Sequence, residues 1–287
     1  MSVGRGSGPV KGVVAPAWRG DLPLCEKVGV RGRRRKWGGM DKSSTMRSLE
    51  RAIDVLEVLD EARQPLRLTE IARRAGLPVP TAQRILAVLE SRDRVERSGA
   101  GYRPGVALTF GAHAYLTTNP LLLVASPVLI DLAVETGLTA SLFREYHDTR
   151  VVLTRAHAQR RLRYELPVGA RLPLHLGAGK ALLAQRSAED ARALLESLGE
   201  TAEYPAPDVE AVLADLARTR ELGYSVAYNE RAPGVASVAA AIPLHGDVRA
   251  AVQVAGYTED VPEARTAALG LEVQRAALAI GRAVPAG

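Results

Sequence analysis

Cysteine is nearly absent from this chain of 287 residues: Cys25 is the only one, which rules out an intrachain disulfide and argues against a cysteine-ligated zinc site. The sequence also lacks the Gly-x-Ser-x-Gly turn that carries the nucleophile of many hydrolases. No two histidines are spaced as a metal-binding pair such as His-Glu-x-x-His; the histidines are His113, His147, His157, His175 and His245. We therefore expect no cofactor and no metal, and we do not predict an enzyme.

Long hydrophobic runs are missing as well. The longest, Leu121–Ile130, is interrupted by Ser126 and Pro127 and is too short to span a bilayer. The chain opens without the charged and then apolar segments of a signal peptide. These absences predict a cytoplasmic protein without a membrane partner. A hydrophobic content of 47% and a charged content of 24% are typical of globular proteins, and the length suggests about two domains.

Positive charge is concentrated in the first 46 residues. They hold ten Lys or Arg and three Asp or Glu, whereas the whole chain has a net charge of +6, so the remainder is nearly neutral. Residues 1–46 are rich in Gly, Pro, Arg and Lys and show no apolar periodicity, which predicts a disordered basic tail. The run 31–37 can touch phosphates without sequence preference. Equally open is a mis-assigned start, with Met40 or Met46 as the true first residue.

The stretch 68–104 organises the rest of the chain, because it has the pattern of a helix, a tight turn, a second helix and a hairpin. The first helix is predicted from Thr69, whose hydroxyl can cap it, to Ala75, with Gly76 ending it. The second starts at Pro80, which suits a first helical position because its missing N–H would be unpaired there. Its buried face repeats at helical spacing and consists of Ala82, Ile85, Leu86 and Leu89.

The opposite face of the second helix is slim and weakly basic, as a helix that enters the major groove requires. A hairpin turning at 98–101 follows, and Gly99 and Gly101 permit the positive φ values of a tight turn. Its arginines can reach phosphates. The residues expected to contact double-stranded operator DNA are Thr69, Thr81, Gln83, Arg84, Arg94, Arg97 and Arg103. A three-helix packing module with a solvated hairpin is the alternative interpretation.

Helices are also predicted on both sides of this unit. One runs from Ser48, a plausible cap, to Ala62, and Leu66 and Leu68 can form a short strand behind the hairpin. After Pro104, the segment 106–116 predicts a helix that is apolar on most sides and therefore needs a partner. We interpret it as a linker and dimer contact; packing against its own domain is the alternative.

The chain beyond residue 126 alternates between strand and helix patterns. Predicted helices lie at 126–135, 179–186, 188–198, 208–222 and 262–282. Predicted strands lie at 139–146, 150–157, 164–166, 171–175, 223–228, 235–244 and 249–257. Hairpins with segregated helices indicate a mostly antiparallel α+β domain.

Four segments, in order, carry a family resemblance: SLERAIDVLEVL (48–59), LTEIARRAGLPVPTAQRILAVLE (68–90), RLPLHLGAGKALLA (171–184) and ERAPGVASVAAAIPL (230–244). With them the chain resembles the isocitrate-lyase-regulator (IclR) family of bacterial transcription factors. The resemblance implies a winged helix-turn-helix domain at 47–104, a linker helix at 105–125 and a GAF-like effector-binding domain at 126–287. It further implies a homodimer or dimer of dimers, a small organic acid as effector, and most often repression.

The chain departs from the family pattern at several positions. Pro80 stands where the family usually has a serine cap, and the segment 175–179 is one residue shorter than usual. Ala227 stands where an acidic residue is frequent, and Gln253-Val254-Ala255 replaces a Ser-x-Ser pattern. Because the site then carries fewer hydroxyls, we expect a ligand larger or less polar than glyoxylate-type acids.

The segment Gly177–Lys180 opens a predicted helix, and free N–H groups at a helix start can hold a carboxylate. The alternative is a glycine-rich turn selected only for close helix packing. Together with the resemblance, the expected ligand-binding residues are Tyr164, Leu172, Gly177, Ala178, Gly179, Glu230, Ser237, Gln253 and Ala255. Glu230 has a second interpretation, in which its carboxylate accepts from backbone donors.

Two other functions stay open at this stage. One is a small-acid hydrolase that uses Ser237 and His175, although no nucleophile–base motif supports it. The other is an architectural DNA-binding dimer whose ligand pocket is vestigial.

Overall fold

A computed structural model describes residues 44–62, 64–157, 162, 166–200 and 204–285. The predicted basic tail lies outside the described residues except for its last three, which begin helix α1 (Ser44–Glu61). Tyr164 and most of the predicted strand 164–166 also lie outside them, and Leu166 is not in a strand.

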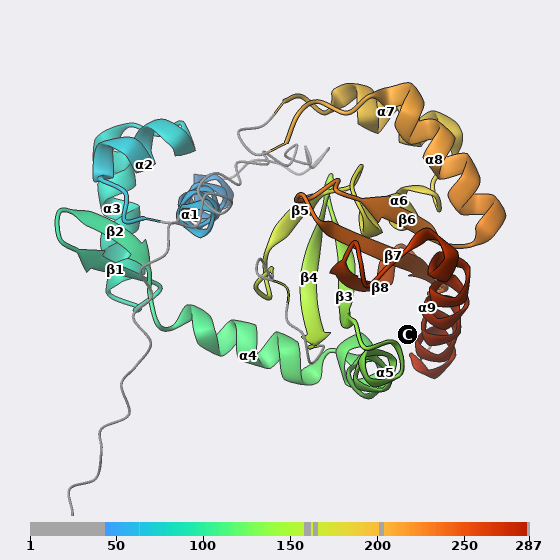
Figure 1. Cartoon of the computed structure of the whole chain (residues 1–287). Coiled ribbons are helices and arrows are strands. Elements are labelled where there is room, and N and C mark those ends of the chain that lie inside the picture. The colour runs from blue at the N-terminus through green and yellow to red at the C-terminus, as the bar shows by residue number, and fades with distance from the viewer. Residues whose placement is uncertain (1–43, 63, 158–161, 163–165, 201–203, 286–287) are drawn as a thin grey trace, which may run out of the picture.

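The N-terminal domain is a winged helix-turn-helix, as predicted. Helices α2 (Leu68–Ala75) and α3 (Val79–Glu90) follow α1, and strands β1 (Val95–Ser98) and β2 (Gly101–Pro104) form the hairpin, here called the wing (Figure 1). Its core is one apolar cluster: Val55, Leu59, Ile71, Ala75, Leu86, Val95 and Tyr102. Leu66 bridges to Tyr102 and thus backs the wing, whereas Leu68 begins α2.

Several local predictions in this domain are wrong. The N-cap of α2 is Arg67, so Thr69 lies inside the helix and does not cap it. Ser48 lies within α1 because that helix starts four residues earlier. Only Gly99 in the wing has positive φ (58°). Gly101 lies in a crowded place instead, since a Cβ there would lie 3.0 Å from the Cβ of Pro65.

Two helices connect the domains. Helix α4 (Leu108–Thr118) buries none of its residues, which argues against the alternative interpretation of packing against its own domain. Helix α5 starts earlier than predicted and spans Pro120–Thr136, with Asn119 capping it through a bond from the Leu121 N–H (3.0 Å). No single helix among the described residues is long and apolar enough to cross a membrane; α4 and α5 meet those criteria only as a pair, bent by 71°.

The C-terminal domain is built on a six-stranded antiparallel sheet of order β5-β4-β3-β8-β7-β6. The strands are β3 (Thr139–Tyr146), β4 (Thr149–Ala156), β5 (Arg171–Pro173), β6 (Ser225–Tyr228), β7 (Val235–Ile242) and β8 (Ala250–Tyr257). The helices are α6 (Ala178–Leu183), α7 (Ala188–Ser197), α8 (Val209–Leu222) and α9 (Glu263–Ala283). The predicted α+β fold class is therefore confirmed.

The alternation of side chains along each strand gives the sheet two apolar faces. One face packs against α5 and α9, and includes Leu142 and Val252. The other packs against α6, α7 and α8, and includes Phe143 and Ala251 (Figure 1). The edge strand β5 faces the N-terminal domain, where Arg171 lies 3.6 Å from Glu61 of α1.

Candidate functional site

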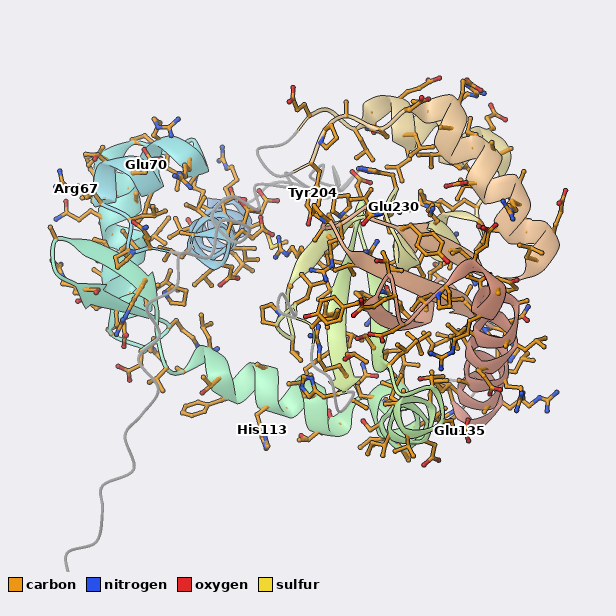
Figure 2. All side chains as sticks on the ribbon, in the orientation of Figure 1. Arg67, Glu70, His113, Glu135, Tyr204 and Glu230 are labelled. Carbon is orange, nitrogen blue, oxygen red and sulfur yellow. The ribbon has the colours of Figure 1, made fainter. Side chains whose placement is uncertain are left out.

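The first candidate site is the exposed side of α3. Ala82 and Leu86 are fully buried in the domain core, which turns Gln83 and Arg84 toward solvent and leaves Thr81 half-buried. This is the predicted orientation. Thr69 is exposed near the start of α2, and Arg67 lies at the outer edge of the domain (Figure 2). Arg67 was not among the predicted DNA contacts.

The wing arginines are paired within the domain. Arg97 lies 2.9 Å from Glu90 and its guanidinium lies over the Tyr102 ring, while Arg103 lies 2.6 Å from Glu96. Exposed pairs of this kind contribute little stability, so phosphates can compete for both arginines. Arg94 is exposed just before β1. Their phosphate contacts stay predictions.

The second candidate site lies on the sheet face that α6 covers. Directly paired residues of antiparallel strands point to the same side, so the register defines two rows across the sheet. The first row is Ser141, Gln253, Ala239 and Ser225, and the second is Thr139, Ala255, Ser237 and Ala227. The structure therefore brings Ser237, Gln253 and Ala255 together, as predicted, on a face that carries hydroxyl and amide groups between apolar residues.

Gly177 lies directly above these rows. Its φ of 51° is in the left-handed region, and a Cβ built on it would lie 3.6 Å from Ser237 Oγ and 3.9 Å from Gln253 Oε1. The same Cβ would lie 3.3 Å from Nη2 of Arg150. Three polar side chains from β4, β7 and β8 thus converge on one point at the start of α6.

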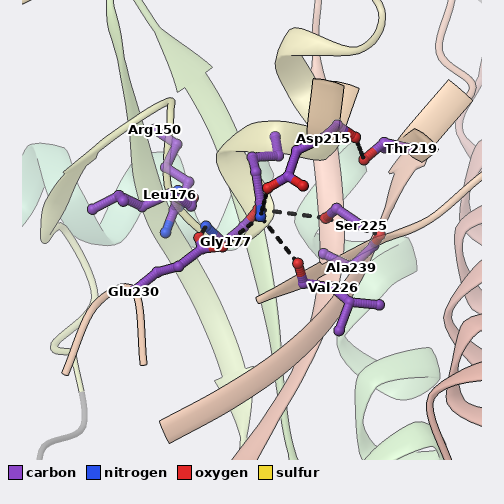
Figure 3. Close-up of polar contacts among 10 residues, drawn as sticks. Arg150, Leu176, Gly177, Asp215, Thr219, Ser225, Val226, Glu230 and Ala239 are labelled. Carbon is purple, nitrogen blue, oxygen red and sulfur yellow. Dashed lines mark hydrogen bonds and ion pairs between the residues drawn. The ribbon is translucent and has the colours of Figure 1, made fainter. Parts of the chain in front are cut away.

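Two of the N–H groups that were expected to be free at this helix start are occupied. Gly177 N–H donates to Glu230 Oε2 (2.8 Å), and Gly179 N–H donates to the Leu176 carbonyl (3.0 Å). Glu230 therefore accepts from a backbone donor, the second interpretation given to it above (Figure 3). Helix α6 also has only six residues, which limits its dipole.

The positive charge of Lys180 is already compensated by two carboxylates. Its side chain is 2% exposed, and its Nζ forms ion pairs with Asp215 (2.8 Å) and Glu230 (Figure 3). It also donates to the Val226 carbonyl at 3.0 Å. A buried ammonium with two carboxylates is a poor site for a further anion, so Lys180 serves to fasten α6 to α8 and to the segment after β6.

Three predicted ligand residues have packing roles instead. The side chains of Leu172 and Ala178 lie in the apolar cluster between sheet and helices. A Cβ at Gly179 would lie 2.2 Å from the Leu174 carbonyl oxygen, so glycine is required there for close packing. The packing interpretation of the glycine-rich turn is thus correct for Gly179, while Gly177 adjoins the polar cluster.

Arg150 was missed by the sequence reasoning. It is 2% exposed, its Nη1 donates to the Pro173 carbonyl (2.9 Å) and to the Leu176 carbonyl, and its guanidinium lies 5.1 Å from the centre of the Phe143 ring. Burial lowers the pKa of Arg150 to about 9, against the opposing effect of Tyr204 and Glu230, so it remains cationic at neutral pH. In the sequence, Arg150 is a single charged residue at the start of an apolar strand, a pattern that by itself does not indicate a binding residue.

His175 is buried and its Nδ1 has no hydrogen-bond partner in the described part of the chain. Burial, followed by the positive charge of Arg150, lowers the pKa of His175 to about 4. His175 is therefore neutral at pH 7, and it is held so by its surroundings and not by a carboxylate partner of the kind that orients a catalytic base.

We expect this burial to make the protein less stable in mild acid. The pKa of His175 is about 4 in the fold against 6.5 for the free side chain, so its contribution is complete above pH 6.5 and is lost progressively as the pH falls toward 4. Discounted for partial hydration, the loss between pH 7.5 and 5 is roughly 1–2 kcal/mol. Urea unfolding of the wild type and of His175→Gln at both pH values measures it. Equal losses in the two proteins would assign the effect to other groups.

Comparisons with known proteins agree with this architecture. The family model described as Bacterial transcriptional regulator IclR C-terminal matches residues 113–282, and the IclR helix-turn-helix domain matches residues 48–99. The transcriptional repressor IclR of Escherichia coli (strain K12) is 33% identical over 261 residues, which are 86% of this chain and 93% of that protein.

Solved structures share the fold. An IclR family transcriptional regulator from Brucella abortus superposes with a TM-score of 0.74 at 22% identity, over 83% of this chain and 93% of that one. An IclR homolog from Microbacterium hydrocarbonoxydans, solved in complex with 4-hydroxybenzoate, gives a TM-score of 0.66 at 24% identity, over 83% and 98% of the two chains.

Proposed function

The chain belongs to the IclR family of bacterial transcriptional regulators, and from that premise we propose that it is a repressor whose affinity for operator DNA is set by a small organic acid bound in its C-terminal domain. The proposal of an acid rests on the polar cluster that Arg150, Ser237 and Gln253 form around Gly177. The chain is a DNA-binding regulator and not an enzyme, so the hydrolase hypothesis for Ser237 and His175 is set aside.

On the DNA side, the exposed face of α3 supports insertion into the major groove, with the wing following the backbone. The proposed contacts are Arg67 and the seven predicted residues, which are Thr69, Thr81, Gln83, Arg84, Arg94, Arg97 and Arg103. The neighbour from Microbacterium hydrocarbonoxydans is complexed with an aromatic acid, which is consistent with a small acid as effector here. The ion pair between Arg171 and Glu61 joins the strand beside Arg150 to the DNA-binding domain.

The function is tested with the full-length protein and labelled DNA from upstream of its own gene. We expect tight, sequence-specific binding by fluorescence anisotropy, a change in affinity of about 1–3 kcal/mol when the correct acid is added, and no consumption of that acid. Specific binding that no small acid alters would favour the architectural dimer. A total loss of sequence preference would reject the DNA-binding assignment of α3.

We also propose that α4 is the contact between two copies. It exposes large apolar side chains, with Phe110 at 67%, Tyr115 at 39% and Leu116 at 37%, and it buries none of its residues within the chain. An apolar helix that buries none of its residues against the described part of the chain favours a partner outside it. Two DNA-binding domains joined this way would present two α3 helices to a symmetric operator.

Phe110→Glu is expected to weaken dimerisation by more than about tenfold, because a charge would replace an apolar anchor while the fold of each copy is untouched. Analytical ultracentrifugation over a concentration series measures the change. Val248→Glu is the matched control, since Val248 is also exposed and apolar (38%) but lies in the turn between β7 and β8. If both variants stay dimeric, α4 is not the contact.

A further inference from the structure

We propose that the last three residues of β3, Arg144–Tyr146, couple the C-terminal domain to the DNA-binding domain, and that Glu145 is the positioning residue through which a shift of α6 reaches α4 and α1. This inference rests on the proposed function and concerns its regulation. It depends on contacts between the two domains and on no particular effector.

The end of β3 carries side chains on both faces of the sheet. Successive residues of a strand point to opposite faces, and Phe143 lies in the apolar cluster that includes α6. Glu145 shares that face, and its carboxylate pairs with Arg186, which follows α6. Arg144 and Tyr146 lie on the other face. A movement of this short piece of backbone therefore reaches both faces at once.

Arg186 fixes Glu145 to the end of α6. All six residues of α6 are buried, and Arg220 of α8 donates to the carbonyls of Ala184 (3.0 Å) and Arg186 (3.2 Å). A close-packed helix passes a displacement on because it has no free volume to absorb it. Glu145 is itself only 10% exposed, and its carboxylate also lies 3.5 Å from Arg249. A shift at the start of α6 is thus carried to Glu145.

Arg144 connects the end of β3 to the linker helix. Its Nη1 donates to the hydroxyl of Tyr115, near the C-terminal end of α4, at 3.1 Å. The other end of the linker is fastened to the turn after α3, where the Ala107 N–H donates to the Asp93 carbonyl at 3.0 Å. Helix α4 therefore joins the end of β3 to the helix that faces DNA.

Tyr146 connects the end of β3 to α1 through Arg171. The guanidinium of Arg171 lies 5.3 Å from the centre of the Tyr146 ring, and its Nη1 lies 3.6 Å from Glu61 Oε1 at the end of α1. Burial raises the pKa of Asp60 and the positive charge of Arg171 opposes that rise, which places a second carboxylate of α1 near the same arginine. Partly exposed contacts of this kind contribute little stability, so the modest free energies of allosteric coupling can form or break them.

Hydrogen–deuterium exchange of the full-length protein, read by mass spectrometry, tests this coupling without a ligand. Exchange reports the local opening of each segment separately. We expect Glu145→Gln to raise exchange at least about twofold in 112–118 of α4 and in 57–62 of α1, because the contacts that hold both segments come from the neighbours of Glu145.

Two further variants separate the connections. Tyr115→Phe removes only the hydroxyl that accepts from Arg144, so it should raise exchange most in 112–118. Arg171→Gln removes the ion pair with Glu61, so it should raise exchange most in 57–62.

Glu210→Gln is the matched control. It also takes one carboxylate from an arginine pair of the C-terminal domain, but its partner is Arg192 and the pair joins α7 to α8. Exchange in 112–118 and 57–62 should stay at the wild-type level in this variant.

The reverse experiment serves if Glu145→Gln does not fold. Coupling between sites is reciprocal, so the double variant Tyr115→Phe, Arg171→Gln should raise exchange in 180–186, at the end of α6. Both substitutions lie at partly exposed positions, which favours normal folding.

The proposal is overturned if Glu145→Gln raises exchange in 180–186 but leaves 112–118 and 57–62 unchanged, since Glu145 would then have a local packing role. It is equally overturned if the double variant leaves 180–186 unchanged. The proposed function is rejected by a different result, the lack of any acid-dependent change in operator affinity, which the exchange experiment does not use.

Discussion

Arg84→Ala is expected to weaken binding to the specific operator by about 1–3 kcal/mol, the cost of one good side-chain contact to a base edge. Arg84 is exposed on α3 while Ala82 and Leu86 anchor that helix in the core, so the variant should fold normally. Anisotropy titrations at matched salt, with specific and with scrambled DNA, measure the change. A base contact lowers specific affinity most, whereas a phosphate contact lowers both affinities alike.

Arg51→Ala is the matched control for this experiment. Arg51 is exposed on α1, and Figure 1 places α1 on the side of the domain that faces the C-terminal domain. Removing the same charge there should change specific binding by less than about 0.5 kcal/mol. If Arg84→Ala binds the operator as tightly as the wild type, α3 does not read DNA through this residue.

Gly179→Ala is expected to destabilise the protein by about 1–3 kcal/mol, the usual cost of overpacking. The added carbon would lie 2.2 Å from the Leu174 carbonyl oxygen and 2.6 Å from Arg150 Nη1, and the first of these is backbone that moves only with β5 and the turn after it. Because Arg150 would be displaced as well, the variant should also lose its response to the effector. Urea unfolding measures the first effect and operator titration with the acid the second.

The control is Gly199→Ala in the same domain. Nothing lies within 4 Å of a Cβ built there, so the free energy of unfolding should stay within about 0.5 kcal/mol of the wild type. A Gly179→Ala variant as stable as this control would mean that the turn between β5 and α6 yields easily, and the packing role given to Gly179 would be wrong.

Much of the N-terminal domain was predictable because its signals are local. Gly76 ends α2 in the left-handed conformation (φ 67°), and the periodic face with Ala82 and Leu86 is buried as the spacing required. The predicted cap at Thr69 was wrong because α2 extends back to Leu68, which makes Arg67 the N-cap residue. The strands of the hairpin 139–156 were predicted almost residue by residue, because alternation and the turn at 147–148 depend on adjacent residues alone.

The candidate ligand site was predictable only in part. Ser237 and Gln253 were placed on it through the family resemblance, and pairing of β7 with β8 brings their strands together. The facing of Ala178 and Leu172 into the apolar cluster was not predictable, because it depends on the angle at which α6 meets the sheet. Glu230 reaches Gly177 across 53 positions of sequence, and no local pattern reports such a contact.

The sequence by itself therefore determined the winged helix-turn-helix, the antiparallel α+β domain and the family, since helical periodicity, strand alternation and turn residues are written in neighbouring positions. Tertiary structure alone decided which partners the buried cations Lys180 and Arg150 receive. Lys180 and Arg150 look alike as charged residues at the ends of apolar segments. Folding gives Lys180 two carboxylates from distant segments and buries Arg150 among carbonyl oxygens and an aromatic ring, and that difference in partners sets the chemistry of the site.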